Sequence, residues 1–132
     1  MIREAGFVYW GEDEGVIMVG FADQQYRTEQ YVLLQRSTDF SDEDRAFGED
    51  NVHITIDDQS RSQYGGIRSI EIAPGLARIR LEKDSARFLN TDKEIVIRFS
   101  VSEPDLAALV SCLRALLSGT QVKILDEAVR KW

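Results

Sequence analysis

The 132-residue sequence has a formal net charge of -7, 43% hydrophobic residues, two prolines, nine glycines and one cysteine. This length and composition predict a single domain over residues 1–132 and exclude a disordered or collagen-like chain. The longest apolar run, Val16 to Ala22, is too short to span a bilayer, and the first residues lack the apolar core of a signal peptide. A lone cysteine forms no internal disulfide. We therefore expect a cytoplasmic protein with no membrane partner.

The negative charge is concentrated in the N-terminal part of the chain. Residues 1–58 carry 14 acidic and 4 basic side chains, whereas residues 59–100 carry 5 acidic and 8 basic ones. A negative field repels phosphate backbones and attracts basic partners. The charge distribution therefore predicts no nucleic-acid binding through the N-terminal half.

The N-terminal third reads as β-structure. Residues 5–10 and 16–21 are short apolar runs rich in β-branched and aromatic residues, and the acidic, glycine-flanked segment between them predicts a hairpin. A third strand is expected over residues 30–36. A polar connection long enough for a loop or one helical turn joins it to the hairpin.

An acidic loop follows over residues 39–50. We expect Phe40 and Phe47 to hold this loop against the body while its acids stay in water. Residues 52–57 alternate as a half-buried strand, and residues 57–63 are predicted to be a polar connection. The residues of that strand expected to face inward are Val52, Ile54 and Ile56.

The segment from Tyr64 to Phe99 has the clearest local signals. Gly65 and Gly66 indicate backbone that adopts positive φ or lets another segment come close. Pro74-Gly75 predicts a type II turn between strands over 67–73 and 76–82. The core-facing residues expected in the second of these strands are Ala77, Ile79 and Leu81.

Helical signals come next. Asp84 or Ser85 is expected to cap a short helix that ends at Asn90, and residues 94–101 predict a further strand. Ser102 is a strong N-cap for a C-terminal helix whose apolar stripe recurs at helical spacing and which is expected to end at Gly119. The tail over 120–132 is ambiguous between strand and short helix.

These elements together predict an α+β fold. We expect a twisted, mainly antiparallel sheet of about six or seven strands, with the C-terminal helix from Glu103 to Ser118 packed on one face.

No set of residues along the chain predicts a reaction. His53 is expected on the outer side of a strand, with no acid or cysteine at ligand spacing, and Cys112 on the flank of a helix as a partly buried, inert thiol. Tyr64-Gly65-Gly66 matches neither the dinucleotide fingerprint nor the phosphate loop, so no cofactor is predicted. Arg78, Arg80 and Arg98 lack interleaved aromatic residues, which favours a solvated sheet face over an RNA platform.

The acidic loop leaves three interpretations open. Its carboxylates suit a hard cation, but counted from Asp42 the calcium-loop pattern fails, because Ala46 and Phe47 occupy positions that need a ligand and a glycine. A solvated loop is the ordinary state of a charge run. Recognition of a basic partner is the third, and the embedded phenylalanines would supply apolar anchors to an acidic rim.

The order of features from Asp57 to Leu117 resembles the immunity protein 10 family of bacterial polymorphic toxin systems. The resemblance is carried by Asp57-Asp58, Tyr64-Gly65-Gly66-Ile67, the hairpin through Ile72 and Leu81, Asp84 to Leu89, the strand Glu94 to Val101 and the helix from Glu103. It implies an α+β protein that protects its producer by binding a cognate toxin in the cytoplasm, without catalysis.

We therefore expect a non-enzymatic protein that binds a protein toxin through its acidic half. The partner-binding residues predicted on this basis are Asp39, Asp42, Glu43, Asp44, Glu49, Asp50, Asp57, Asp58 and Tyr64. One alternative is a self-associating structural or regulatory subunit, a homodimer with the apolar tail through Trp132 as its contact. Another is a small-ligand pocket lined by Tyr9, Trp10 and Tyr31.

Overall fold

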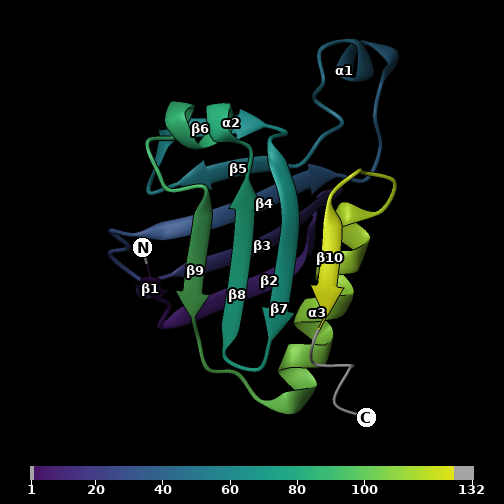
Figure 1. Cartoon of the computed structure of the whole chain (residues 1–132). Helices are drawn as coiled ribbons and strands as arrows, with labels where there is room; N and C mark the ends of the chain where they lie inside the picture. The colour runs from purple at the N-terminus through teal and green to yellow at the C-terminus, as the bar shows by residue number, and fades with distance from the viewer. Residues whose placement is uncertain (1, 127–132) are drawn as a thin grey trace.

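The computed structural model describes residues 2–126, which form two five-stranded sheets packed against each other with three helices around them (Figure 1). The N-terminal sheet is an antiparallel meander of β2 (Phe7–Asp13), β3 (Val16–Ala22), β4 (Tyr31–Ser37), β5 (His53–Ile56) and β6 (Asp58–Tyr64). The C-terminal sheet has the order β1 (Ile2–Glu4), β9 (Glu94–Arg98), β8 (Leu76–Leu81), β7 (Ile67–Ala73) and β10 (Lys123–Asp126). Strands of the two sheets cross at a steep angle in Figure 1.

The α+β class and a C-terminal helix packed on a sheet are confirmed, but the strand count differs from the expected six or seven in one sheet. The described residues form ten strands in two sheets. β1 and β10 add to the edges of the C-terminal sheet by parallel pairing with β9 and β7. Parallel partners come from distant parts of the chain, so no local pattern announces them.

The expectation of a polar connection over residues 57–63 is wrong, because β6 occupies most of it. β6 pairs antiparallel with β5, and the register shifts at the Thr55/Ile56 step beside Asp57, whose φ is 64°. An edge strand can be polar on both faces because its ladder hydrogen bonds, and not apolar burial, hold it in place. β6 lacks the apolar alternation that predicts a strand from sequence.

One apolar core fills the space between the two sheets. It draws Val19, Leu34 and Ile54 from the N-terminal sheet, and Ile79 and Ile97 from the C-terminal sheet, all at most 1% exposed. The inward-facing residues expected from alternation are buried: Val52, Ile54, Ile56, Ala77, Ile79 and Leu81. Burial of these side chains is the main favourable contribution to folding.

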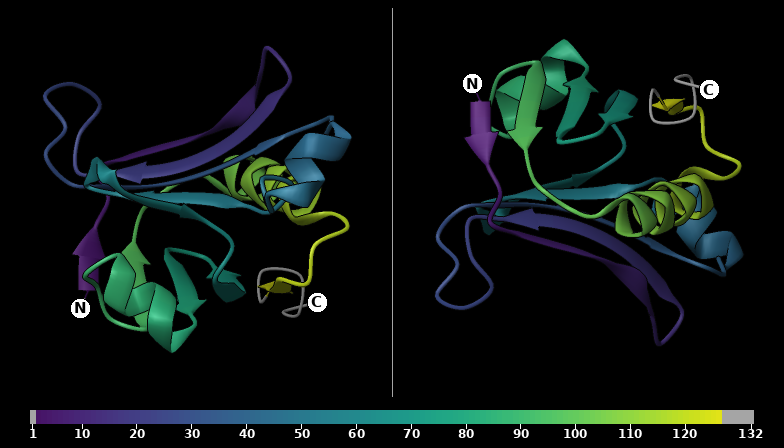
Figure 2. Two further views of the ribbon diagram at one scale, coloured as in Figure 1. Left: turned by 90° about the horizontal axis from the view of Figure 1, so that it is seen from above. Right: turned by 90° about the horizontal axis from the view of Figure 1, so that it is seen from below.

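Helix α3 (Glu103–Leu117) completes the core beside β2, β3 and β10. The Ser102 hydroxyl accepts a hydrogen bond from Asp105 N–H at 3.2 Å, as expected for an N-cap. Six residues of the stripe are buried: Leu106, Leu109, Val110, Leu113, Leu116 and Leu117. Figure 2 shows that α3 and the C-terminal sheet lie on the same side of the N-terminal sheet.

The two short helices depart from expectation in detail. α1 (Asp42–Ala46) lies inside the segment expected to be a loop, and Phe47 is 72% exposed, so its expected packing against the body is wrong. α2 (Lys83–Phe88) is preceded by Glu82 as its N-cap residue, without a side-chain hydrogen bond, and not by Asp84 or Ser85. Asn90 has the expected positive φ, 55°.

The glycines predicted to lie at turns adopt positive φ. Gly75 has φ 79° between β7 and β8, and Gly65 and Gly66 have φ 79° and 86° where the chain passes from β6 to β7. A Cβ atom on Gly66 would collide with the Ser85 hydroxyl of α2, so this position requires both positive φ and close approach. Gly65-Gly66 is thus the crossing point between the two sheets.

The ambiguous tail is a strand over Lys123–Asp126, whereas Val129 and Trp132, expected to contribute to self-association, lie outside the described residues. Within residues 2–126, none of the helices combines the length and apolarity needed to cross a membrane.

Candidate functional site

The charge asymmetry of the sequence coincides with the division into two sheets. Residues 7–64, which contain all of the N-terminal sheet, carry 13 acidic and 4 basic side chains. Residues 2–6 and 65–126 together carry 9 acidic and 10 basic ones. The negative field therefore originates from one layer of the molecule.

Two acidic segments meet at one end of the N-terminal sheet. Thr38 donates from its backbone N–H (2.8 Å) and from its hydroxyl (3.2 Å) to the carbonyl oxygen of Gly15, which joins the β2–β3 turn to the start of the 39–50 segment. We call this cluster the acidic end. It comprises Glu12, Asp13, Glu14, Asp39, Asp42, Glu43, Asp44, Glu49 and Asp50.

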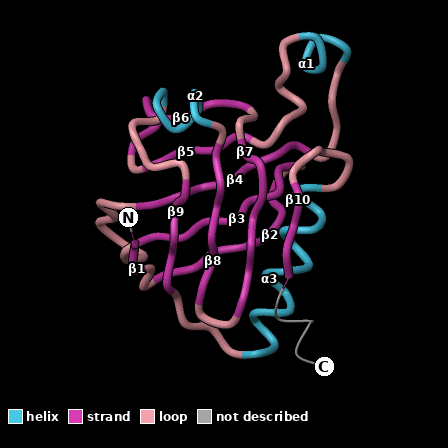
Figure 3. The backbone as a smooth tube through the Cα atoms, in the orientation of Figure 1, coloured by secondary structure: helices cyan, strands magenta, loops and turns pink. Residues whose placement is uncertain are grey.

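The acidic end faces solvent. Seven of its nine carboxylate residues are exposed, and Asp44 and Asp50 are half-buried. Figures 1 and 3 show α1 and its flanking loops projecting away from both sheets. A single ion pair, Arg45 to Asp42 at 3.6 Å, is found there among the described residues, and its exposure makes it weak.

Arg36 fixes the base of the projecting segment. Its Nε donates to the Asp50 carbonyl at 2.8 Å, and its Nη1 donates to the Leu116 carbonyl at the end of α3 at 3.2 Å. The guanidinium carbon also lies 5.0 Å from the ring centroid of Phe40. Phe40, half-buried, thus contacts the body as expected, and Arg36 sets the direction in which the acids point.

Asp44 has a structural role within this segment. It forms a capping box with Ser41: the Asp44 N–H donates to the Ser41 hydroxyl at 3.0 Å, and the Ser41 N–H donates to the Asp44 carboxylate at 2.9 Å. The carboxylates of Asp42 and Glu43, by contrast, extend from an exposed helical turn. They are the better candidates for contact with a partner.

Asp57 and Asp58 lie at the opposite end of β5 and β6 from the acidic end. Arg3 Nη1 and Nη2 donate to the two carboxylate oxygens of Asp57 at 2.6 and 3.0 Å, and Arg61 Nη1 adds a contact at 3.3 Å. Tyr31 N–H donates to the same carboxylate at 2.9 Å. The carboxylate of Asp57 is therefore occupied within the chain, whereas Asp58 is exposed and accepts from Ser60 N–H.

These contacts shift the pKa values of the two acids. Burial by itself raises the pKa of Asp57, but the hydrogen bonds from Arg3 and Tyr31 and the charges of Arg3 and Arg61 outweigh it, so the pKa lies below its ordinary value. The pKa of Asp58 is lowered by the hydrogen bonds from Ser60. Both carboxylates are ionised at neutral pH.

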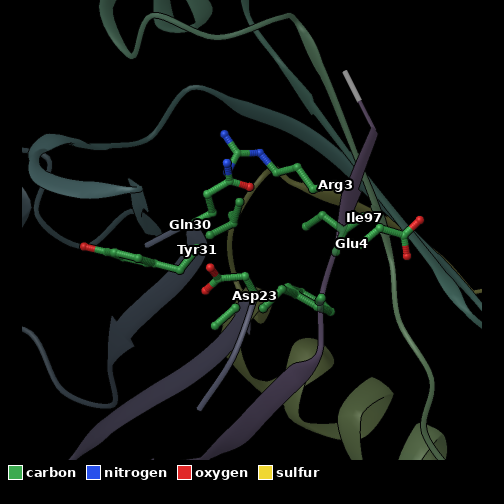
Figure 4. Close-up of a pocket in the computed structure, with 10 residues that line it drawn as sticks. Arg3, Glu4, Asp23, Gln30, Tyr31 and Ile97 are labelled. Carbon is green, nitrogen blue, oxygen red and sulfur yellow. The ribbon is translucent and has the colours of Figure 1, made fainter. Parts of the chain in front are cut away.

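The Asp57 contact connects the two sheets beside a very small hollow. Figure 4 shows Arg3 extending from β1 toward Gln30 and Tyr31, while Glu4 points the other way. The space among the lining residues is about 10 Å³, about the size of one water molecule. This hollow has no room for a ligand.

Tyr64 and His53 form a pair on the outer face of the N-terminal sheet. Their ring centroids are 4.7 Å apart, and Tyr64 is 48% exposed. Burial lowers the pKa of His53, which keeps the imidazole neutral at pH 7. Since β5 begins directly after the 39–50 segment, the pair lies toward the acidic end, unlike Asp57 and Asp58.

The structure also shows the surroundings of the carboxylates, of Cys112 and of the three arginines Arg78, Arg80 and Arg98. No group of three or more His, Cys, Asp or Glu side chains among residues 2–126 is placed to hold a metal ion. Cys112 is half-buried, with its Sγ 3.7 Å from the Met18 carbonyl, and burial raises its pKa. The three arginines of the expected strip are paired with acids: Arg78 with Glu71 and Glu94, Arg80 with Glu94, and Arg98 with Glu4.

Sequence reasoning missed the contribution of Glu12, Asp13 and Glu14 to the acidic end. These residues form the acidic segment of a predicted hairpin turn, and the sequence does not show which other segment the turn approaches. The pairing of β3 with β4, Val16 opposite Ser37, is what brings them beside the 39–50 segment.

The comparison with known proteins agrees with the resemblance seen in the sequence. A family model described as Immunity protein 10 matches residues 3–107, which include both sheets apart from Ile2 of β1 and the whole of β10. The match begins far upstream of Asp57, so it also covers the acidic end. No curated protein matches the chain.

Proposed function

Since the chain belongs to the immunity protein 10 family, we propose that it protects bacterial cells by binding a cognate polymorphic toxin directly, in the cytoplasm and without catalysis. The whole chain, residues 1–132, acts as a single domain in this proposal. Support for that view comes from the one core shared by the two sheets.

The observation that carries the binding mode is the acidic end. Nine carboxylate residues from two segments share one end of the molecule, and the base of the longer segment is held in place by Arg36. Like charges gathered on a surface raise the association rate of an oppositely charged partner. The proposed toxin surface is therefore basic.

A charge-neutralising variant tests this mode. Asp42→Asn with Glu43→Gln removes two exposed charges but leaves the Ser41–Asp44 capping box intact. We expect the association rate with the purified cognate toxin domain to fall about tenfold at low ionic strength. The dependence of that rate on salt should become shallower, because fewer charges are screened.

The matched control is Glu82→Gln with Glu103→Gln, which removes the same charge from exposed positions outside the acidic end. It should change the rate only slightly. Equal effects of the two double variants would show that net charge matters and that the acidic end is not the contact surface. Failure of the parent chain to bind the toxin domain or to protect cells from it would refute the function itself.

A further inference from the structure

The N-terminal sheet has an outer face that neither α3 nor the C-terminal sheet covers (Figure 2). Figure 2 shows both α3 and the C-terminal sheet on its inner side, while the β2–β3 turn and the β3–β4 connection curve outward. Strand pairing aligns the residues of the outer face in rows across the sheet. In one row Tyr9 lies opposite Gly20, and Gly20 lies opposite Leu33. The next row toward the acidic end places His53 opposite Tyr64.

A hollow of about 290 Å³ lies on this face. Its lining is mainly apolar: Phe7, Tyr9, Tyr31 and Leu33 lie around Gly20, and Gln25 and Thr28 of the β3–β4 connection also line it. Tyr9 is 41% exposed. Trp10, expected beside Tyr9 and Tyr31 in a ligand pocket, points the other way and packs against the core.

Gly20 keeps this hollow open. It lies in the interior of β3 and has no positive φ, so its backbone conformation does not require glycine. A Cβ atom there would meet the flexible end of Leu33, its Cδ1 atom, at 3.3 Å, and no other side chain within 4 Å. Glycine within a strand weakens it and often marks a place where another molecule approaches closely.

The hollow and the acidic end fit within one interface. Tyr9 precedes Asp13 by four residues along β2, a distance of about 13 Å at the rise of a strand. A typical interface covers about 800 Å² on each partner, which is wide enough to include both features. Interfaces commonly combine a buried apolar centre with a charged rim, and the rim here is acidic.

We propose that the hollow around Gly20 is a socket that receives an apolar side chain projecting from the basic surface of the toxin. This inference rests on the proposed function and specifies the surface it uses. The charge of the acidic end selects the basic partner, and the socket supplies the apolar anchor that slows dissociation.

Filling the socket tests the inference. Gly20→Val places a branched side chain in the hollow at a position where valine suits a strand. We expect the affinity for the purified toxin domain to fall about 30-fold, through faster dissociation, with the melting temperature unchanged or raised. Ser69→Val, on the C-terminal sheet, is the matched control and should bind like the parent chain.

Tyr9→Ala provides a second variant that removes a wall of the socket without touching the core. It should weaken binding about tenfold. Parent-like affinity in both Gly20→Val and Tyr9→Ala would overturn the socket and leave the proposed function standing. Light scattering that finds the parent chain dimeric and Gly20→Val monomeric would also overturn it, because the occupant would be a second copy of the chain. A parent chain that does not bind the toxin domain would refute both proposals together.

Discussion

The carboxylate of Asp57 links β1 to the N-terminal sheet, and Asp57→Asn removes its charge with little other change. Asparagine adopts positive φ readily, so the 64° backbone angle is retained, and its side-chain oxygen can still accept from Tyr31 N–H. What is lost is the negative charge beside Arg3 and Arg61, together with the two hydrogen bonds that the second carboxylate oxygen accepts, from Arg3 Nη2 at 3.0 Å and from Arg61 Nη1 at 3.3 Å.

The size of the effect follows from burial. The side chains of Arg3 and Asp57 are 11% and 22% exposed, so Arg3 would keep a largely buried positive charge with the opposite charge of Asp57 removed. Breaking a fully buried pair costs about 3–5 kcal/mol and an exposed one less than about 1 kcal/mol. We expect a loss of about 2 kcal/mol in the free energy of unfolding, and a melting temperature roughly 8 °C lower.

The direction of the pKa shift of Asp57 determines how this loss of stability depends on pH. Because the pKa of Asp57 is lower in the folded chain, the carboxylate contributes stability above its ordinary pKa of about 4, and that contribution disappears as the pH falls through the folded value. The difference in the free energy of unfolding between the parent chain and Asp57→Asn should reach its full size at pH 7 and become smaller below about pH 4.

Urea unfolding followed by tryptophan fluorescence from pH 7 down to acid measures this difference. Asp58→Asn is the matched control, since Asp58 is the exposed neighbour, and it should have a much smaller effect at pH 7. A loss that is the same at neutral and acid pH, or equal in the two variants, would refute the assignment of stability to the Asp57 charge.

Two further predictions concern the backbone crossing and the cysteine. Gly66→Ala should lower the free energy of unfolding, measured with denaturant, by about 3 kcal/mol, because the added Cβ atom combines positive φ with a collision against Ser85. Gly65→Ala should lower it by only about 1 kcal/mol, because the nearest atoms to its added Cβ, those of Asn51, lie at 3.7 Å or more. Equal costs would contradict the close approach. The Cys112 thiol should react with a disulfide reagent roughly tenfold more slowly in the folded than in the urea-unfolded chain, as burial raises its pKa, and equal rates would contradict this.

The elements that were predictable depend on near neighbours in the sequence. Ser102 caps α3 through Asp105, three residues away, and Pro74-Gly75 turns β7 into β8. The buried faces of β5, β8 and α3 follow from their own periodicity. In each case the signal and the structure lie within the same few residues, so the sequence contains all the information needed.

Edge strands and long-range contacts were not predictable in this way. β6 is polar on both faces and gives no alternation, although it is a full strand of the N-terminal sheet. The charge of Asp57 predicts a partner-binding residue, and its contact with Arg3, which is 54 residues away, is not visible in the sequence. No local pattern reveals an ion pair between residues this far apart in the sequence.

The sequence by itself determined an α+β fold, an acidic N-terminal half and the family of the chain, because composition, periodicity and short turn motifs do not depend on distant residues. Only the tertiary structure decided how these parts combine. The crossing at Gly65-Gly66 divides the strands into two sheets, and strand pairing brings the β2–β3 turn beside residues 39–50. The uncovered face around Gly20 exists because α3 and the C-terminal sheet share the other side, an arrangement set by burial of apolar surface between layers.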